Sequence, residues 1–365
     1  MNMNMSTSIS TIELLKKLCN SFGPTGAEEG VAALIKEEIA DICPEARCDK
    51  MGNLIAVMGF GDVNASDRKR IMVSAHMDEV GFMITEIRSS GYLGIDTVGG
   101  INSAVLAGRK VTVRTKDGEL IAGVIPSKAI HHKDKDDRLK PLSAEKLYID
   151  IGAKDDEEAA RYVRIGDFAT FDSEFYTFGE NGGMLKAKAI DDRMGCAALI
   201  ETMRALKKNP PVGNIDACFC FTVREEIGRS GAKAAAYALR PHLSLVLETT
   251  AVADIADVEP ARRVADVGEG VVISVMDRST IYNKDTVRAA FEIAKKTGVK
   301  AQVKRYVSGG NDAGTIHRVA EGINVLAMSV PTRYLHSAAC VASLEDYEAQ
   351  KRLTEEIIRN YTSII

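Results

Sequence analysis

The sequence contains no tryptophan, and aromatic residues make up only 5% of its 365 residues. Such a composition argues against an endoglucanase, whose sugar platform needs stacked aromatic side chains. The net charge of −4 gives no concentrated positive charge for phosphates, so we expect no nucleic-acid partner. Apolar runs also stay well short of the roughly 20 residues that cross a bilayer, so we expect no membrane partner.

The sequence also lacks signs of export or of a thiolate metal site. Residues 1–10 do not show the basic and then apolar layout of a signal peptide. The seven cysteines are odd in number and scattered, and they form no Cys-x-x-Cys pair. We therefore expect a cytoplasmic protein with reduced cysteines.

The length favours two domains, and the residue pattern divides the chain into three parts. Residues 1–79 begin with expected helices at 11–20 and 28–42 and continue with strands. Residues 80–184 read as short alternating strands with turns, with a helix only at 156–162. From 185 to 365 helices alternate with buried strands. We predict an α/β domain from residues 1–79 and 185–365, with a small β-barrel or sandwich of residues 80–184 inserted in it.

Polar clusters stand where apolar strands are expected to end. Three of them are His76-Met77-Asp78, Arg224-Glu225-Glu226 and Glu248-Thr249-Thr250. A fourth, Asp191-Asp192-Arg193, opens a helix, and a fifth, Tyr334-Leu335-His336, follows the last core strand. Open α/β sheets place their sites at the carboxyl ends of strands. Imidazole with carboxylate suits zinc, cobalt or manganese.

Each cluster also has a purely structural explanation. Asp191 and Asp192 are suitable helix N-caps, and Glu225-Glu226 is compatible with a solvated strand end. His336 alone is compatible with an ordinary structural histidine. Asp78 strengthens the metal hypothesis for His76, because a carboxylate two residues away can bind the second ring nitrogen.

The order of five segments resembles the TET and glutamyl aminopeptidase family of dinuclear metallopeptidases, which also includes deblocking aminopeptidases. The segments are residues 75–81 (AHMDEVG), 189–195 (AIDDRMG), 223–228 (VREEIG), 309–313 (GGNDA) and 331–337 (PTRYLHS). The resemblance covers essentially the whole chain. It implies a zinc-exopeptidase-like α/β/α sandwich with a mixed sheet, and an inserted β domain that mediates dimerisation.

The resemblance also implies roles for individual residues. It implies two divalent ions, zinc or cobalt, a general base at Glu225 and a supporting carboxylate at Asp78. Glu248 stands where the family usually has aspartate. A cis peptide bond is expected after Asp191, and a substrate-pocket loop at Gly309, Gly310, Asn311 and Asp312. The implied metal ligands are His76, Asp191, Glu226, Glu248 and His336.

The implied activity is removal of N-terminal residues from short peptides by a homo-oligomer, built from dimers and up to a dodecamer. Two alternatives remain at this point. One is a metal-dependent carboxypeptidase or deacylase on the same scaffold, and the glutamate at position 248 is the feature that favours it. The other is a non-catalytic binding protein that has kept the fold.

Overall fold

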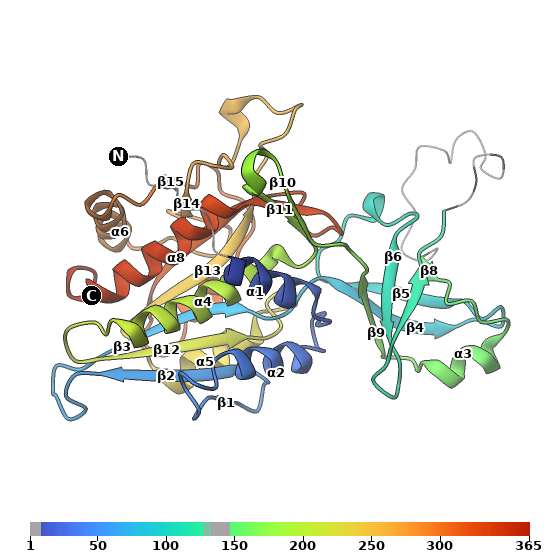
Figure 1. The fold of residues 1–365 in the computed structure, drawn as a ribbon, viewed down its shortest axis with the longest axis horizontal. Helices are drawn as coiled ribbons and strands as arrows, with labels where there is room; N and C mark the ends of the chain where they lie inside the picture. The colour runs from blue at the N-terminus through green and yellow to red at the C-terminus, as the bar shows by residue number, and fades with distance from the viewer. Residues whose placement is uncertain (1–8, 128, 130, 132–146) are drawn as a thin grey trace.

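The structure, a computed structural model, describes residues 9–127, 129, 131 and 147–365. It contains one large and one small β-sheet, which lie side by side along the longest axis of the molecule (Figure 1). In the described part of the chain, no helix is both long enough and apolar enough to cross a membrane.

The large sheet has 11 strands and is mixed. Its main path runs β1-β2-β12-β3-β13-β16-β17-β11-β10, and β14 joins β15 to β16. Strands β12, β3, β13 and β16 are parallel to one another, whereas β2 is antiparallel to β12. The strands are β1 (Arg47–Cys48), β2 (Leu54–Phe60), β3 (Lys69–His76), β10 (Tyr176–Phe178), β11 (Met184–Ala187), β12 (Ile215–Thr222), β13 (Leu243–Ala251), β14 (Val271–Ile273), β15 (Ala301–Val303), β16 (Asn324–Arg333) and β17 (Cys340–Ser343).

Helices cover both faces of this sheet. Helix α4 packs on β3 and β13 with α1 and α8 beside it, and α5 packs on β12 and β3 with α7 beside it. The helices are α1 (Ile9–Asn20), α2 (Glu29–Glu38), α3 (Asp156–Tyr162), α4 (Ile190–Lys208), α5 (Ser230–Leu239), α6 (Lys284–Thr297), α7 (Ala313–Ile316) and α8 (Leu344–Arg359), with 3-10 turns η1 (Ser103–Val105), η5 (Glu180–Gly182), η6 (Pro260–Arg262) and η7 (Tyr361–Ser363). The predicted α/β/α sandwich is confirmed.

The small sheet is antiparallel and nearly closed. Its order is β7-β6-β9-β4-β5-β8, and a bridge between Val124 and Asp150 brings its two edges together. It has its own hydrophobic core, in which Phe82 and Phe171 meet edge to face. Its strands are β4 (Gly81–Ile87), β5 (Leu93–Val98), β6 (Lys110–Arg114), β7 (Leu120–Val124), β8 (Tyr148–Ile149) and β9 (Phe168–Phe171). The predicted inserted β-barrel is confirmed. Its boundaries at 80 and 184 remain a prediction, and β10 pairs with the large sheet.

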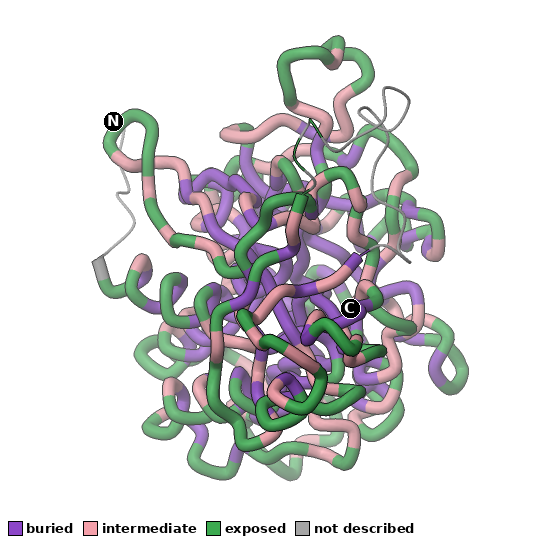
Figure 2. The backbone as a smooth tube through the Cα atoms, turned by 90° about the vertical axis from the view of Figure 1, so that its right-hand side faces the viewer, coloured by how far each residue is buried: buried purple, intermediate pink, exposed green. Residues whose placement is uncertain are grey.

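Buried residues are concentrated inside the molecule (Figure 2). Many of them lie in the central strands and in α4. Strands β12, β3 and β13 read as nearly continuous apolar runs because helices cover them on both faces. In the parallel register, His76 lies opposite Thr222. The segments that follow these strands therefore emerge at one edge of the sheet, where the polar clusters of the sequence meet.

Several sequence-based expectations need correction. The second helix ends at Glu38 and not at Ile42. The residues from Val271 to Met276 have the pattern of one strand, but β14 ends at Ile273, because the chain turns there and Met276 forms a separate bridge with Ile281. The expected exposed loop at 131–140 lies almost entirely outside the described residues.

The first turn of the last helix contains two polar residues with different partners. Ser343 caps α8, and its hydroxyl accepts a hydrogen bond from the Glu345 N–H. Asp346, three residues after Ser343, accepts hydrogen bonds from the Gly268 and Gly270 N–H groups, both at 2.7 Å. Asp346 therefore stabilises the turn at residues 268–270 and does not cap α8.

Arg193, on α4, is a fully buried cation that ties the end of α1 to the end of β3. Its guanidinium donates to the carbonyl oxygens of Met77 at 2.7 Å, Leu18 at 2.6 Å and Gly23 at 3.2 Å. Glu79 lies 3.6 Å away and supplies the opposite charge. Since Met77 stands between His76 and Asp78, Arg193 also fixes the segment that carries them.

We predict that Arg193→Met lowers the free energy of unfolding by about 3–5 kcal/mol, because it leaves several buried carbonyl oxygens without a hydrogen-bond donor. Arg204→Met is the matched control on the same helix. Arg204 bonds Glu38 near the surface, and its loss is expected to cost at most about 1 kcal/mol. Urea unfolding measures both values, and equal losses would contradict the role given to Arg193.

Candidate metal centre

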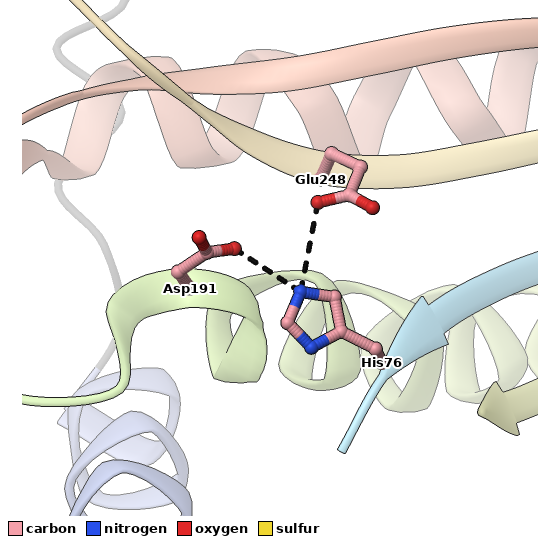
Figure 3. Close-up of side chains that lie close together, drawn as sticks. All are labelled: His76, Asp191 and Glu248. Atoms are coloured by element: carbon pink, nitrogen blue, oxygen red, sulfur yellow. Dashed lines mark hydrogen bonds and ion pairs between the residues drawn. The ribbon is translucent and has the colours of Figure 1, made fainter. Parts of the chain in front are cut away.

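The centre lies at the sheet edge where β3, β13 and α4 meet. His76 is the last residue of β3, Glu248 lies on β13, and Asp191 is in the first turn of α4. The three side chains converge from these elements (Figure 3). His76 Nε2 is 3.2 Å from Asp191 Oδ1 and 3.6 Å from Glu248 Oε2. The other ring nitrogen, Nδ1, contacts the backbone oxygen of Asp78 at 3.0 Å and its carboxylate at 3.5 Å.

A second group shares Asp191 with the first. His336 Nε2 is 3.3 Å from Asp191 Oδ2 and 3.3 Å from Glu226 Oε1. Asp191 thus directs one oxygen toward each histidine. In each group, His76-Asp191-Glu248 and Asp191-Glu226-His336, the atoms able to bind a metal lie within 4.8 Å of one another.

The backbone at Asp191 departs from helical geometry, so its side chain does not follow the direction of α4. Asp191 and Asp192 have non-helical dihedral angles, and the peptide bond between them is cis, as expected. Asp192 is the residue that caps, since its Oδ1 accepts the Gly195 N–H at 3.1 Å. Of the two aspartates, Asp191 is therefore the one that faces the histidines.

Asp78 is fully buried beneath the centre and organises the Glu225-Glu226 segment. Its carboxylate accepts hydrogen bonds from the Glu225 N–H at 3.0 Å, the Glu226 N–H at 3.1 Å and the Thr25 hydroxyl at 2.7 Å. Burial works to raise the pKa of Asp78, but His76 and these donors lower it overall. Asp78 therefore stays ionised and fixes the backbone that carries both glutamates.

Four carboxylates, those of Asp191, Glu225, Glu226 and Glu248, are crowded at the centre. Burial works to raise the pKa of Asp191, but contacts with His336 and His76 lower it overall. The pKa values of the three glutamates are raised. Burial raises the pKa of Glu225 well above its ordinary value, and Glu248 raises it further. Burial also raises the pKa of Glu226 and of Glu248. Burial lowers the pKa of His336, but contacts with Asp191 and Glu226 outweigh it and raise that pKa to about 11. A bound cation would favour the ionised form of these carboxylates, and their convergence makes the centre suited to hold one.

Glu225 belongs to neither three-residue group. Its Oε1 accepts a hydrogen bond from Arg229 Nε at 2.7 Å. It lines a pocket of about 1070 Å³ together with Asp191, Glu226, Glu248 and His336. Glu225 therefore lies beside the candidate ligands and can contact a molecule bound in the pocket.

The expected pocket loop is only partly at the pocket surface. Gly309, Gly310 and Asn311 line it. Asp312 is buried, and its Oδ2 accepts the Thr222 hydroxyl at 2.7 Å.

Sequence reasoning missed two supports of the site. Thr25 binds Asp78, and the Gly100 carbonyl lies 2.8 Å from His336 Nδ1. For the contact with His336, the adjacent glycines at 99 and 100 are the signal in the sequence, because glycine often marks a close approach of backbone.

The donor atoms fit a divalent ion. Imidazole nitrogen with carboxylate oxygen is the set that zinc and cobalt accept. The two groups offer this set twice, with Asp191 common to both.

Comparison with known proteins identifies the family. The family model described as M42 glutamyl aminopeptidase matches residues 52–353. The chain belongs to this family. It is therefore an aminopeptidase of the M42 metallopeptidases, and the carboxypeptidase, deacylase and non-catalytic alternatives are set aside.

Solved structures and relatives agree with this assignment. The M42 chain is 35% identical to a TET aminopeptidase from a marine sediment Thaumarchaeota archaeon, with a TM-score of 0.90 over 96% of each chain. It is 36% identical to the Pyrococcus horikoshii TET1 peptidase, with a TM-score of 0.84 over 95% of this chain and 98% of that one. That peptidase can assemble into a tetrahedron or a large octahedral shell. The lysyl aminopeptidase of Pyrococcus furiosus is 29% identical over 95% of this chain and 96% of its own.

We predict that zinc raises the melting temperature of chelator-treated protein, because a cation that binds only the folded centre stabilises it. Asp191→Asn should remove most of this shift, since Asp191 serves both groups. Asp117→Asn, in an exposed turn, is the control and should keep the shift. Calorimetry with and without zinc measures the shift in melting temperature. A full shift in Asp191→Asn would contradict the assignment of Asp191 as a metal ligand.

Proposed function

We propose that this aminopeptidase works with two divalent ions, zinc or cobalt. His76, Asp191 and Glu248 would hold one ion, and Asp191, Glu226 and His336 the other. The observation that carries the proposal is that the two oxygens of Asp191 face different histidines. Glu248 reaches His76 from β13, which supports a ligand role for glutamate at this position.

When bound, such a pair of ions lowers the pKa of water and polarises a carbonyl group. Glu225 is the proposed general base. It takes a proton from the water that attacks the scissile carbonyl and passes that proton to the leaving amine. Burial raises the pKa of Glu225 above the ordinary carboxyl value, which makes the carboxylate a stronger base. Arg229 holds the Glu225 carboxylate in place.

The proposed substrates are short peptides with a free N-terminus. The pocket is large enough for several residues, and Gly309 and Gly310 let the peptide approach the backbone of its wall closely. Asp78 has a positioning role, because it holds the N–H groups of Glu225 and Glu226. The seven cysteines are free, which supports a place in the reducing cytoplasm.

We predict that Glu225→Gln lowers kcat by about 10²–10⁴-fold, because the amide cannot take the proton. Metal content should be unchanged, since Glu225 lies outside both ligand groups. Metal analysis together with kcat on an aminoacyl-nitroanilide checks both points. Glu259→Gln, an exposed control, should keep full activity. Near-normal turnover by Glu225→Gln would remove Glu225 from the role of base.

We also propose a homo-oligomer built from dimers, up to a dodecamer. The assembly of the P. horikoshii TET1 peptidase supports it. So do Tyr176 and Phe178, two exposed aromatic residues on the edge strand β10.

Light scattering coupled to size exclusion should therefore give a mass that is a multiple of the 39.4 kDa chain. Exchanging both aromatic residues for serine should lower that mass if they lie in a contact between subunits. A stable monomer of the unmodified protein would contradict the proposal.

A further inference from the structure

A buried ion pair lies behind the candidate metal centre, and the proposed mechanism does not use it. Lys188 directly follows β11 and is 5% exposed, and Glu79 is 2% exposed. The Lys188 ammonium group donates hydrogen bonds to Glu79 Oε1 at 2.6 Å and to Glu79 Oε2 at 2.8 Å. It also donates to the Ser21 carbonyl oxygen at 3.2 Å. Both charges of the pair are therefore shielded from water.

Each partner of the pair stands close in sequence to a candidate ligand. Glu79 comes shortly after His76 at the end of β3, and Lys188 comes shortly before Asp191 at the start of α4. Glu79 also lines a small cavity together with Asp191 and His336. The pair therefore links the two chain segments that bring His76 Nε2 and Asp191 Oδ1 to 3.2 Å from each other.

Glu79 is the fixed end of this link. Its Oε2 accepts a hydrogen bond at 2.8 Å from the hydroxyl of Thr170, a buried residue on β9 of the small sheet. Its backbone N–H donates to the Gly23 carbonyl oxygen at 3.1 Å, and its carbonyl oxygen accepts the Thr25 N–H at 3.0 Å. Glu79 is thus held through both its side chain and its backbone.

The segment that carries Lys188 is irregular in comparison. Ala189 has a left-handed φ of 53°, which is uncommon for a residue other than glycine, and Asp191 has non-helical dihedral angles. Regular hydrogen bonding of a strand or helix does not place such a segment. We infer that the contact between Lys188 and Glu79 sets its position.

Fold stability alone is a weak reason for burying this pair. Taking two charges out of water costs about as much free energy as their attraction returns, so apolar residues of similar volume are often as stable. Hydrogen bonds between charged groups do fix distance and direction, which apolar contacts do less well. Groups that orient metal ligands commonly change metal affinity or activity by about 10–100-fold when they are lost.

We propose that Lys188, through its bond to Glu79, is a positioning residue that fixes Asp191 relative to His76. The inference rests on the proposed function, because it takes Asp191 and His76 as ligands of the proposed ions. Lys188 touches neither the ions nor the substrate in this proposal. Its effect is on the geometry with which the centre holds a metal ion.

The test is Lys188→Met, which keeps a long side chain and removes its charge and hydrogen bonds. Zinc titration of the chelator-treated protein should show a dissociation constant raised by about tenfold or more for at least one ion. The visible absorption of the cobalt-loaded protein should also change in wavelength or intensity, because this spectrum depends on the geometry around the ion. Neither measurement requires turnover of a substrate.

Lys186→Met is the matched control. Lys186 lies on β11, two residues before Lys188, and is half-buried. Its ammonium group also makes two hydrogen bonds, to the Ser173 hydroxyl at 2.8 Å and to the Glu174 carbonyl oxygen at 2.7 Å. Both partners belong to the segment before β10 and not to the segment after β3. Lys186→Met should therefore change neither the zinc affinity nor the cobalt spectrum.

The melting temperature of the metal-free protein separates positioning from a structural role. Lys188→Met leaves Glu79 with Arg193, whose Nη2 lies 3.6 Å from Glu79 Oε1, so one charge of each sign remains. The metal-free variant should therefore melt close to the unmodified protein.

The proposal is overturned if Lys188→Met keeps the zinc affinity of the unmodified protein, or if its cobalt spectrum is unchanged, whatever its melting temperature. Failure of the proposed function looks different, since the unmodified protein would then bind neither zinc nor cobalt at the centre. That result would remove both proposals.

Discussion

The arrangement of the site depends on one carboxylate between two imidazole rings. Asp191 contacts His76 through one oxygen and His336 through the other. Glu226 and Glu248 complete the two groups, and Glu225 stands beside them. Like charges this close and this buried repel one another strongly. The fold supplies only part of the compensating positive charge, from the two histidines and Arg229. A centre of this composition is stabilised by bound cations, which is the physical reason to assign it to metal ions.

The surrounding structure keeps these repelling groups in place. Arg193 holds the carbonyl oxygen of Met77, and Asp78 holds the N–H groups of Glu225 and Glu226. A further support comes from the segment after β5 of the small sheet, where the Gly100 carbonyl lies against His336 Nδ1. The small β domain therefore helps to orient a candidate ligand, whatever part it takes in assembly. A change in the position of this domain relative to the large sheet would therefore alter the contact between Gly100 and His336.

The fold and most of the centre could be predicted from the sequence because both follow from local patterns. Buried apolar runs that end in polar clusters indicate parallel strands with a shared edge, and the structure brings His76, Asp191, Glu226, Glu248 and His336 together there. The sequence could not show which aspartate caps α4, because Asp191 and Asp192 are chemically identical neighbours. Nor could it show that Asp346 binds a turn 76 and 78 residues away, since that depends on tertiary contacts.

The pocket has an uneven distribution of charge that bears on catalysis. One part of its wall carries the carboxylates of the centre, and another carries Lys304 and the free end of Arg229. Arg229 belongs to both, because its Nε bonds Glu225 while Nη1 and Nη2 lie against Gly310. An anion at the guanidinium end would draw on the same positive charge that holds Glu225. Ground-state binding and the position of the proposed base are therefore connected through one side chain.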